Sequence, residues 1–203
     1  MRVMVVLSRI YTRTGDDGTT ALGDFSRTAK TDPRLVAYAD CDETGAAIGV
    51  AIAAGDLPAD MATLLQRIQN DLFDVGADLC TPLAASYEHP PLRVQEPWVD
   101  ELEQACDSFG EPLATLRSFV LAGGTVGAAY LHVARTVARR AERSTWAAIE
   151  AYGTDEDGGV NPLTARYLNR LSDLLFILSR AANHGHGGDV LWQPGGGRQT
   201  PPA

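Results

Sequence analysis

Apolar residues recur every three or four positions through most of this chain, and this spacing predicts a helical protein. Residues at such steps share one face of an α-helix. The clearest apolar stripe consists of Met61, Leu64, Leu65, Ile68, Leu72, Val75 and Leu79. A preceding helix is expected from Pro33, which suits a first turn, to about Ala54, where Gly55 ends it.

Three more helices are expected downstream, and Pro- or Gly-rich segments separate them. Their predicted spans are about 96–109, 126–152 and 162–182. We therefore expect an all-α fold, a five-helix bundle with a separate N-terminal loop.

The predicted organisation has one helical unit over residues 9–183. Residues 1–8 form an N-terminal extension, and residues 184–203 form a tail rich in glycine and proline. We expect little order in this tail, except that Val190-Leu191-Trp192 docks on the rest of the protein.

Composition narrows the possible functions. The 203 residues are 45% hydrophobic, which is enough for one packed domain or one subunit of an oligomer. The net charge of −9 argues against nucleic acid as a partner, because phosphate backbones select basic surfaces. Three cysteines without CxxC spacing indicate reduced thiols in the cytoplasm. The apolar run over residues 3–7 is too short for a membrane span or a signal peptide.

The most informative polar segment is Thr12-Arg13-Thr14-Gly15-Asp16-Asp17-Gly18-Thr19-Thr20. Its glycines and hydroxyls could direct several donors at one phosphate group. Gly-Asp-Asp-Gly is also good sequence for a surface turn. The segment lacks the Gly-Lys-Ser/Thr ending of a P-loop, so an ordinary Walker nucleotidase is disfavoured.

Two later helices carry further polar groups. Arg135, Arg139 and Arg143 follow one another at i,i+4 steps, with Glu142 beside them. Their repulsion calls for carboxylates from elsewhere or a bound polyphosphate, although a solvated face is the simpler alternative. In the last helix, Asn169 and Asp173 are spaced to form an i,i+4 polar pair, which structural hydrogen bonding would also explain.

These motifs occur in an order that resembles a known family. After Tyr11–Thr20 come Asp32-Pro33-Arg34, Ala37-Tyr38, Asp42-Glu43, Ser118–Leu121, Gly123-Gly124, His132–Arg135, Arg139–Arg143 and Tyr167–Asp173. The pattern resembles the PduO-type ATP:cob(I)alamin adenosyltransferases over residues 9–183.

The resemblance implies a homotrimer of five-helix bundles with active sites between subunits. It implies transfer of the 5′-deoxyadenosyl group of ATP to cob(I)alamin, which gives adenosylcobalamin and triphosphate. The implied ATP-binding residues are Thr12, Arg13, Thr14, Gly15, Asp16, Gly18, Thr20, Lys30, Arg139, Glu142, Arg143 and Asn169. Asp42 would pair with Arg135 across the subunit boundary, and Phe119 would lie beneath the corrin.

Cobalt(I) is the nucleophile in this chemistry, so the protein needs no catalytic serine or cysteine. Its task is to orient ATP and to stabilise the leaving triphosphate, with Arg139 as the chief cation. Mg²⁺ is expected to bind through phosphate oxygens and water rather than through a protein ligand cluster. A cobalamin reductase and a B12-dependent mutase are the implied partners, with no nucleic acid and no membrane.

The chain departs from the family pattern at three places. Asp17 stands where lysine is usual, Thr44-Gly45 replace the usual leucine and asparagine, and Ala122 replaces a common proline. Aspartate at position 17 removes a positive charge that could contact a phosphate group. The last should loosen the loop that carries Phe119.

Three other functions remain open on the residues alone. One is a carrier that binds ATP and corrinoid and delivers the cofactor to a mutase. Another is a structural trimer without a ligand. The third is a metal sensor that uses His184, Gly185 and His186, which lacks further ligands at usable spacing.

Overall fold

Five α-helices form the body of the protein, as predicted. The computed structural model describes residues 10–196, so the predicted extension over residues 1–8 and the end of the tail lie outside the described residues. The helices are α1 (Pro33–Ala54), α2 (Ala59–Leu79), α3 (Glu96–Gly110), α4 (Val126–Tyr152) and α5 (Pro162–Asn183). An antiparallel hairpin of β1 (Thr19–Ala21) and β2 (Arg27–Ala29) precedes them, which the sequence did not predict.

Side-chain caps explain where several helices begin. The Asp32 carboxylate accepts a hydrogen bond from the Arg34 backbone N–H at 2.8 Å, and Pro33 follows it at the first helical position. Asn161 accepts from the Leu163 N–H at 3.1 Å in the same way, also just before a proline. These caps satisfy N–H groups that have no partner within the helix.

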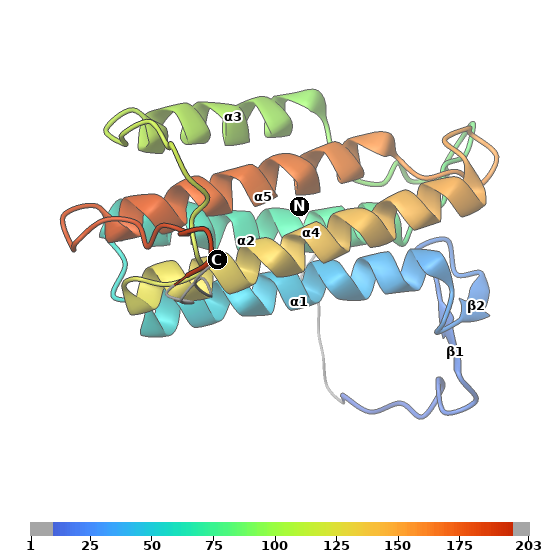
Figure 1. Cartoon of the computed structure of the whole chain (residues 1–203). Helices are drawn as coiled ribbons and strands as arrows, with labels where there is room; N and C mark the ends of the chain where they lie inside the picture. Colours follow the sequence, from blue (N-terminus) through green and yellow to red (C-terminus); the bar gives the residue numbers. More distant parts are fainter. Residues whose placement is uncertain (1–9, 197–203) are drawn as a thin grey trace, which may run out of the picture.

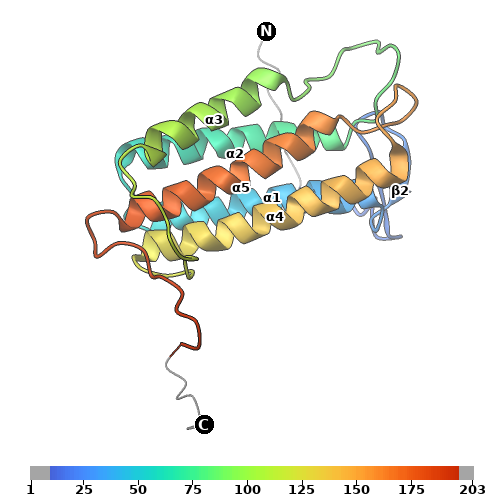
Figure 2. The same ribbon diagram turned by 45° about the horizontal axis from the view of Figure 1, so that its top comes forward.

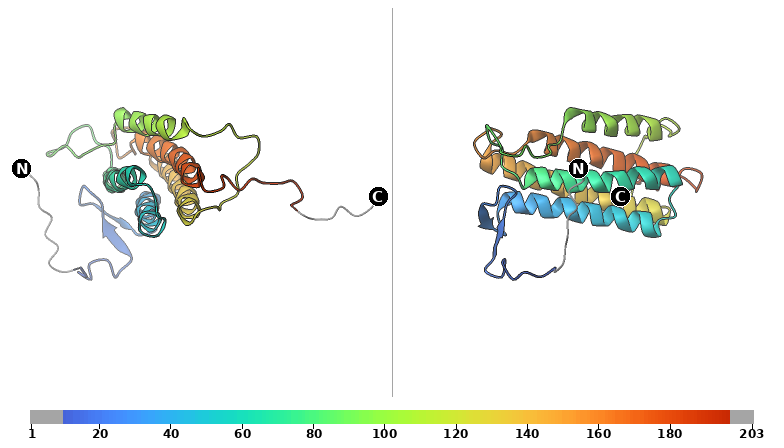
Figure 3. Two further views of the ribbon diagram at one scale, coloured as in Figure 1. Left: turned by 90° about the vertical axis from the view of Figure 1, so that its left-hand side faces the viewer. Right: turned by 180° about the vertical axis from the view of Figure 1, so that it is seen from behind.

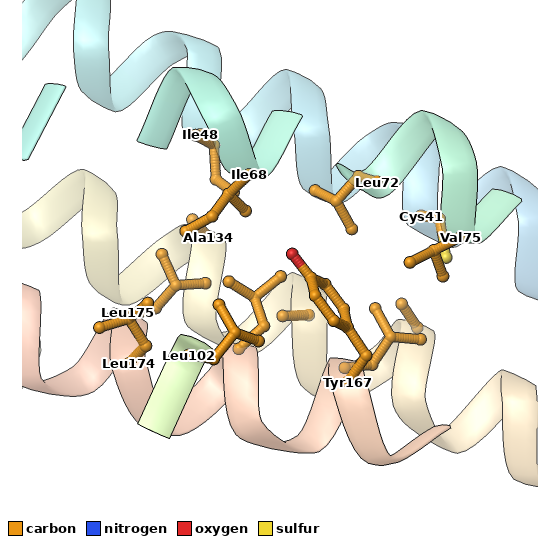
Figure 4. Packing of buried hydrophobic residues seen from close by; sticks show 14 of the residues in the cluster. Cys41, Ile48, Ile68, Leu72, Val75, Leu102, Ala134, Tyr167, Leu174 and Leu175 are labelled. Carbon is orange, nitrogen blue, oxygen red and sulfur yellow. The ribbon is translucent and has the colours of Figure 1, made fainter. Parts of the chain in front are cut away.

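The core lies where the apolar stripes of the helices meet. α1 packs against α2 and α4, α4 packs against α5, and α3 lies outside on α5 (Figures 1 and 2). Tyr167 of α5 lies among the buried side chains with its hydroxyl toward the α2 side (Figure 4). That hydroxyl donates to Asp71 at 2.9 Å, so the buried phenol is not left without a partner.

The two ends of the bundle carry the segments of functional interest. The hairpin lies where α1 begins and α4 ends, whereas residues 111–125 and the tail lie where α4 begins and α5 ends (Figures 1 and 3). The 27 residues of α4 separate these ends by about 40 Å. Within residues 10–196, no helix has the length and apolarity needed to cross a membrane.

A buried arginine fixes the hairpin end. Arg34 is only 2% exposed, and its guanidinium donates to the carbonyls of Leu79 and Gly158 at 2.9 and 2.7 Å. The ring of Tyr152 lies 4.8 Å from the guanidinium carbon. Arg34 therefore joins the start of α1 to the end of α2 and to the loop after α4.

Candidate active site

The polar segment before the hairpin forms a tight, exposed turn. The Gly18 N–H donates to the Gly15 carbonyl at 3.2 Å, and Gly18 has a φ of +81°, which favours glycine. Thr12, Arg13, Thr14 and Asp16 are exposed on this segment. It lies beyond α1, on the side away from α5 (Figure 3). Its donors are therefore available to a ligand or to another subunit.

Asp17, the residue that departs from the expected lysine, closes the turn. Its carboxylate accepts from the backbone N–H of Thr19 at 3.0 Å and from the Thr19 hydroxyl at 2.8 Å. These hydrogen bonds lower the pKa of Asp17. Arg27 lies 3.6 Å from the same carboxylate and donates to the Thr14 carbonyl at 2.9 Å. Arg27, which the sequence analysis missed, brings a cation into this turn.

Lys30, one of the predicted ATP-binding residues, lies against the turn. A Cβ built on Gly15 would lie 3.0 Å from the Lys30 Nζ and 3.0 Å from the Thr19 carbonyl oxygen. The Lys30 backbone N–H also donates to the Gly18 carbonyl at 2.9 Å. Glycine at position 15 thus leaves room for the ammonium group beside the loop backbone.

A second group of predicted residues lies together on α4 and α5. The Asn169 side-chain amide donates to the Glu142 carboxylate at 3.0 Å. The predicted Asn169–Asp173 pair is wrong, because Asp173 instead accepts from Arg170 at 2.7 Å. The i,i+4 spacing places Asn169 and Asp173 on one face of α5, but Asn169 bonds to Glu142 and Asp173 bonds to Arg170.

Arg139 and Arg143 are exposed, and neither side chain forms a hydrogen bond or an ion pair with any of residues 10–196. Arg140 beside them is different, since it pairs with Asp40 and Glu43 of α1. Two unpaired cations near the Glu142–Asn169 contact form a site that is suited to an anion.

Arg135 lies one turn earlier, partly buried against Phe176. Its guanidinium carbon is 5.9 Å from the Phe176 ring centroid, and its Nε is buried without a partner among the described residues. Burial, and then the charge of Arg139, lower the pKa of Arg135. His132 packs on the same ring with both ring nitrogens unpartnered, and burial lowers its pKa. The sequence analysis did not single out His132 as a site residue.

Asp42, the predicted partner of Arg135 across the subunit boundary, lies on α1. It is exposed and forms no ion pair within the described part of the chain. It borders a hollow of about 240 Å³ between α1 and α2, which Tyr38, Gly45 and the exposed Phe73 also line. Thr44, by contrast, is buried and donates to the Asp40 carbonyl at 2.7 Å. Of the two unusual residues at this place, only Gly45 reaches the hollow.

Phe119 projects from the loop at the opposite end of the bundle. Its side chain is 78% exposed, and Trp192 of the tail meets it edge-on at a centroid distance of 6.0 Å. The Trp192 N–H donates to the Phe119 carbonyl, and the Leu121 N–H donates to the Val190 carbonyl, both at 2.8 Å. The predicted docking of Val190–Trp192 is confirmed, and these residues pair with the segment that carries Phe119.

The single chain does not bring the predicted groups into one site. Arg139 lies 13 residues before Tyr152 along α4, or about 20 Å from the hairpin end. No hydrogen bond or ion pair among residues 10–196 joins the loop over residues 12–20 to Arg139. Glu142 and Asn169 meet, and Lys30 meets the loop, but these two pairs remain apart.

Comparisons with known proteins agree on one family. Residues 10–182 match the family model described as cobalamin adenosyltransferase. A corrinoid adenosyltransferase of Mycobacterium leprae is 63% identical over 193 residues, which cover 94% of this chain and 98% of that protein. A cobalamin adenosyltransferase of Cupriavidus metallidurans is 44% identical over 188 residues, covering 92% and 95%.

Solved structures give the same result. A variant of the PduO-type ATP:corrinoid adenosyltransferase from Lactobacillus reuteri, complexed with cobalamin and ATP, superimposes with a TM-score of 0.81. It is 33% identical and covers 91% of this chain and 97% of that chain. Another variant of the same protein, complexed with ATP, superimposes with a TM-score of 0.78.

Proposed function

The chain belongs to the cobalamin adenosyltransferase family and is a corrinoid adenosyltransferase, and we propose that its active sites form between the subunits of a homotrimer. The observation that carries this proposal is that Arg139 lies about 20 Å along α4 from the hairpin end and has no hydrogen bond or ion pair with the 12–20 loop of its own chain. A neighbouring subunit would bring the loop to the unpaired arginines.

In this arrangement, the backbone N–H groups and hydroxyls of the loop bind the ATP phosphates together with Lys30. Arg139 stabilises the negative charge that grows on the triphosphate as the bond from C5′ to oxygen breaks. The Glu142–Asn169 pair, joined at 3.0 Å, holds the nucleoside part. Arg143 adds a second cation at the edge of this site.

The new bond joins cobalt to C5′. Cob(I)alamin supplies the electron pair, and triphosphate leaves with the electrons of the broken carbon–oxygen bond. The exposed ring of Phe119 offers an apolar surface to the corrin, where it excludes a lower axial ligand. Mg²⁺ would be held through the phosphate oxygens of ATP and water, and it would share the stabilisation of the triphosphate charge. Within residues 10–196 no cluster of three acidic, cysteine or histidine side chains could hold a metal ion, and His184 and His186 lack a third ligand.

The wider setting follows from this chemistry. A cobalamin reductase supplies cob(I)alamin, and a B12-dependent mutase uses the product. Burial raises the pKa of Cys80 and of Cys106 to about 11, so both thiols stay protonated at neutral pH. Three free cysteines fit a reducing cytoplasm.

The function is tested by mixing the protein with chemically reduced cobalamin, first without and then with ATP. We expect the optical spectrum to change to that of adenosylcobalamin, with one triphosphate released for each cofactor formed. A spectrum that changes on corrin binding but yields no triphosphate would indicate a carrier instead. No spectral response to either substrate would overturn the proposal.

The subunit arrangement is tested separately with Asp42→Asn. An interfacial ion pair with Arg135 that loses one charge leaves the other unpaired, so association should weaken at least about tenfold. Gel filtration over a dilution series measures this effect. Asp107→Asn changes an exposed carboxylate on α3 and serves as the control. Assembly that is equally stable in both variants would contradict the Asp42–Arg135 contact.

A further inference from the structure

One face of α5 runs from the Glu142–Asn169 contact to the end of the bundle that carries Phe119. Asn169, Phe176, Arg180 and Asn183 are separated by seven, four and three residues, so they follow one stripe of the helix. The stripe begins at the Glu142–Asn169 contact and ends about 21 Å farther along, below residues 111–125. The sequence analysis assigned no role to its last two members.

Asn183 is a fully buried amide that holds the loop after Phe119. Its Oδ1 accepts from the Thr125 backbone N–H at 2.8 Å, and its Nδ2 donates to the Gly123 carbonyl at 3.1 Å. Its own carbonyl accepts from the N–H groups of His186 and Gly188 at 3.0 and 3.2 Å. One residue therefore fixes both the loop and the first turn of the tail.

Gly124 shows how closely this contact is fitted. Its φ of +99° is a conformation that side chains disfavour. A Cβ at this position would also lie 2.2 Å from Oδ1 and 2.5 Å from Nδ2 of Asn183. Glycine is needed here because the Asn183 amide occupies the space that a side chain would take.

Arg180, one turn before Asn183, makes the same two connections with its side chain. Its Nη2 donates to the Ala114 carbonyl at 2.7 Å, at the beginning of the loop. Its Nε donates to the Asp189 carboxylate at 2.8 Å, just before the tail residues that pair with Phe119. Both side chains of this ion pair are nearly nine-tenths buried, so solvent screens it little.

From these contacts we infer that Asn183 and Arg180 are positioning residues for Phe119. The Phe119 ring is exposed and has one aromatic neighbour, Trp192, so the backbone on either side sets its position. The clamp formed by Asn183 and Arg180 holds the loop at its two ends and the tail segment that pairs with it. It also compensates for Ala122, where proline would have stiffened the loop. The inference rests on the proposed contact between Phe119 and the corrin.

The first test measures, without any substrate, how strongly the clamp protects the loop and the tail from hydrogen–deuterium exchange. Asn183→Ala removes two side-chain hydrogen bonds, and Ser179→Ala is its control. Ser179 is equally buried in the same turn, but its hydroxyl donates to the Phe176 carbonyl within α5. Hydrogen–deuterium exchange should rise about tenfold or more over residues 114–125 and 186–192 in Asn183→Ala alone. Unchanged exchange in those segments would overturn the inference, whatever the function of the protein.

The second test measures the consequence for the corrin. With Asn183→Ala, we expect the KM for cob(I)alamin to rise about tenfold while the KM for ATP stays within about twofold. The fraction of four-coordinate cob(II)alamin at saturating ATP should fall in parallel. Equal losses for both substrates, or none for the corrin, would contradict a positioning role.

A conservative variant covers the case in which Asn183→Ala does not fold. Arg180→Lys keeps the charge opposite Asp189 but lacks the guanidinium fork that also reaches the Ala114 carbonyl. It should raise exchange over residues 114–125 more than over residues 186–192. The optical spectrum of the wild-type protein with reduced cobalamin separates the two proposals. If that spectrum does not respond to the corrin, the proposed function fails. The exchange measurement still tests whether Asn183 and Arg180 hold the loop and the tail.

Discussion

The two ends of the bundle present their functional residues in different ways. At the hairpin end, the 12–20 loop lies apart from α5, and its residues Thr12, Arg13 and Thr14 are exposed. At the other end, the loop with Phe119 is paired with the tail and held from below by α5. One chain thus completes the support of Phe119, whereas among residues 10–196 no arginine of α4 forms a hydrogen bond or an ion pair with the 12–20 loop.

Under the proposed subunit arrangement, this difference implies that nucleotide binding depends on assembly. If the 12–20 loop needs cations from a neighbouring subunit, it should bind ATP tightly only in the oligomer. The apolar surface at Phe119 is already formed in each subunit. Variants at the two ends should therefore impair nucleotide and corrin steps separately.

The largest expected effect comes from Arg139→Ala. Loss of a cation that stabilises the leaving triphosphate should reduce kcat about 100- to 1000-fold. Corrin binding and assembly should remain unchanged, because Arg139 pairs with no other group in residues 10–196. Turnover, the cob(II)alamin spectrum and gel filtration measure the three properties.

Arg140→Ala is the matched control for that experiment. Arg140 is the next residue on α4, but its charge is already paired with Asp40 and Glu43. Exposed ion pairs contribute little, so activity should change only a few-fold. Equal losses in the two variants would show that the face carrying Arg139 is not the phosphate site.

The helical part of the fold was predictable because local signals were strong. Pro33 and Pro162 at first helical positions, with Asp32 and Asn161 as caps, mark where α1 and α5 begin. The apolar stripe of α2 is buried as its spacing indicated, apart from Leu64, which is partly buried. Each of these features is encoded within a few residues.

The second prediction concerns the other end of the bundle. Phe119→Ala should lower the fraction of four-coordinate cob(II)alamin about tenfold, because a large apolar group no longer excludes the axial ligand. The affinity for ATP should not change. Spectroscopy of cob(II)alamin with ATP and a separate nucleotide titration measure these quantities.

Phe25→Ala provides the comparison at the hairpin end. Phe25 is also highly exposed, but it lies between the two strands, far from the tail. We expect no change in the cob(II)alamin spectrum with this variant. If it lowered the four-coordinate fraction as much as Phe119→Ala, the assignment of the corrin to the tail end would be wrong.

The features that sequence reasoning missed depend on contacts between distant residues. The strands of the hairpin have three residues each, too few for an alternating pattern to be visible. Asn183 reaches Thr125 and Arg180 reaches Ala114 across 58 and 66 positions. Asn169 forms its hydrogen bond with Glu142 on α4 rather than with Asp173, four residues away on the same helix. Helical spacing alone does not identify these partners, because they lie on other segments of the chain.

The smallest expected effect tests how the hairpin end is anchored. Tyr152 donates its hydroxyl to Asp32, which also accepts from the Thr28 hydroxyl of β2 at 2.7 Å. Tyr152→Phe keeps the ring beside Arg34 and should lower the free energy of unfolding by about 1 kcal/mol near neutral pH. Denaturant unfolding of both proteins between pH 3 and 10.5 or so measures the difference.

The difference in the free energy of unfolding between wild type and Tyr152→Phe should depend on pH, because two titratable groups share the hydrogen bond. Burial raises the pKa of Asp32, but hydrogen bonds from Tyr152, Thr28 and the Arg34 N–H outweigh it and lower the pKa overall. The contribution of the Asp32 carboxylate is therefore present above its ordinary pKa of 3.8 and is lost as the pH falls through the lower folded value. The hydrogen bond to Asp32 raises the pKa of Tyr152, so the phenol's contribution is complete below its ordinary pKa of 10.0 and is lost as the pH rises through the higher folded value. The difference between wild type and Tyr152→Phe should thus be constant from about pH 5 to 9 and shrink on both sides. A difference that does not vary with pH would contradict the hydrogen bond between the Tyr152 hydroxyl and the Asp32 carboxylate. No difference at any pH would show that the ring, rather than the hydroxyl, anchors the hairpin.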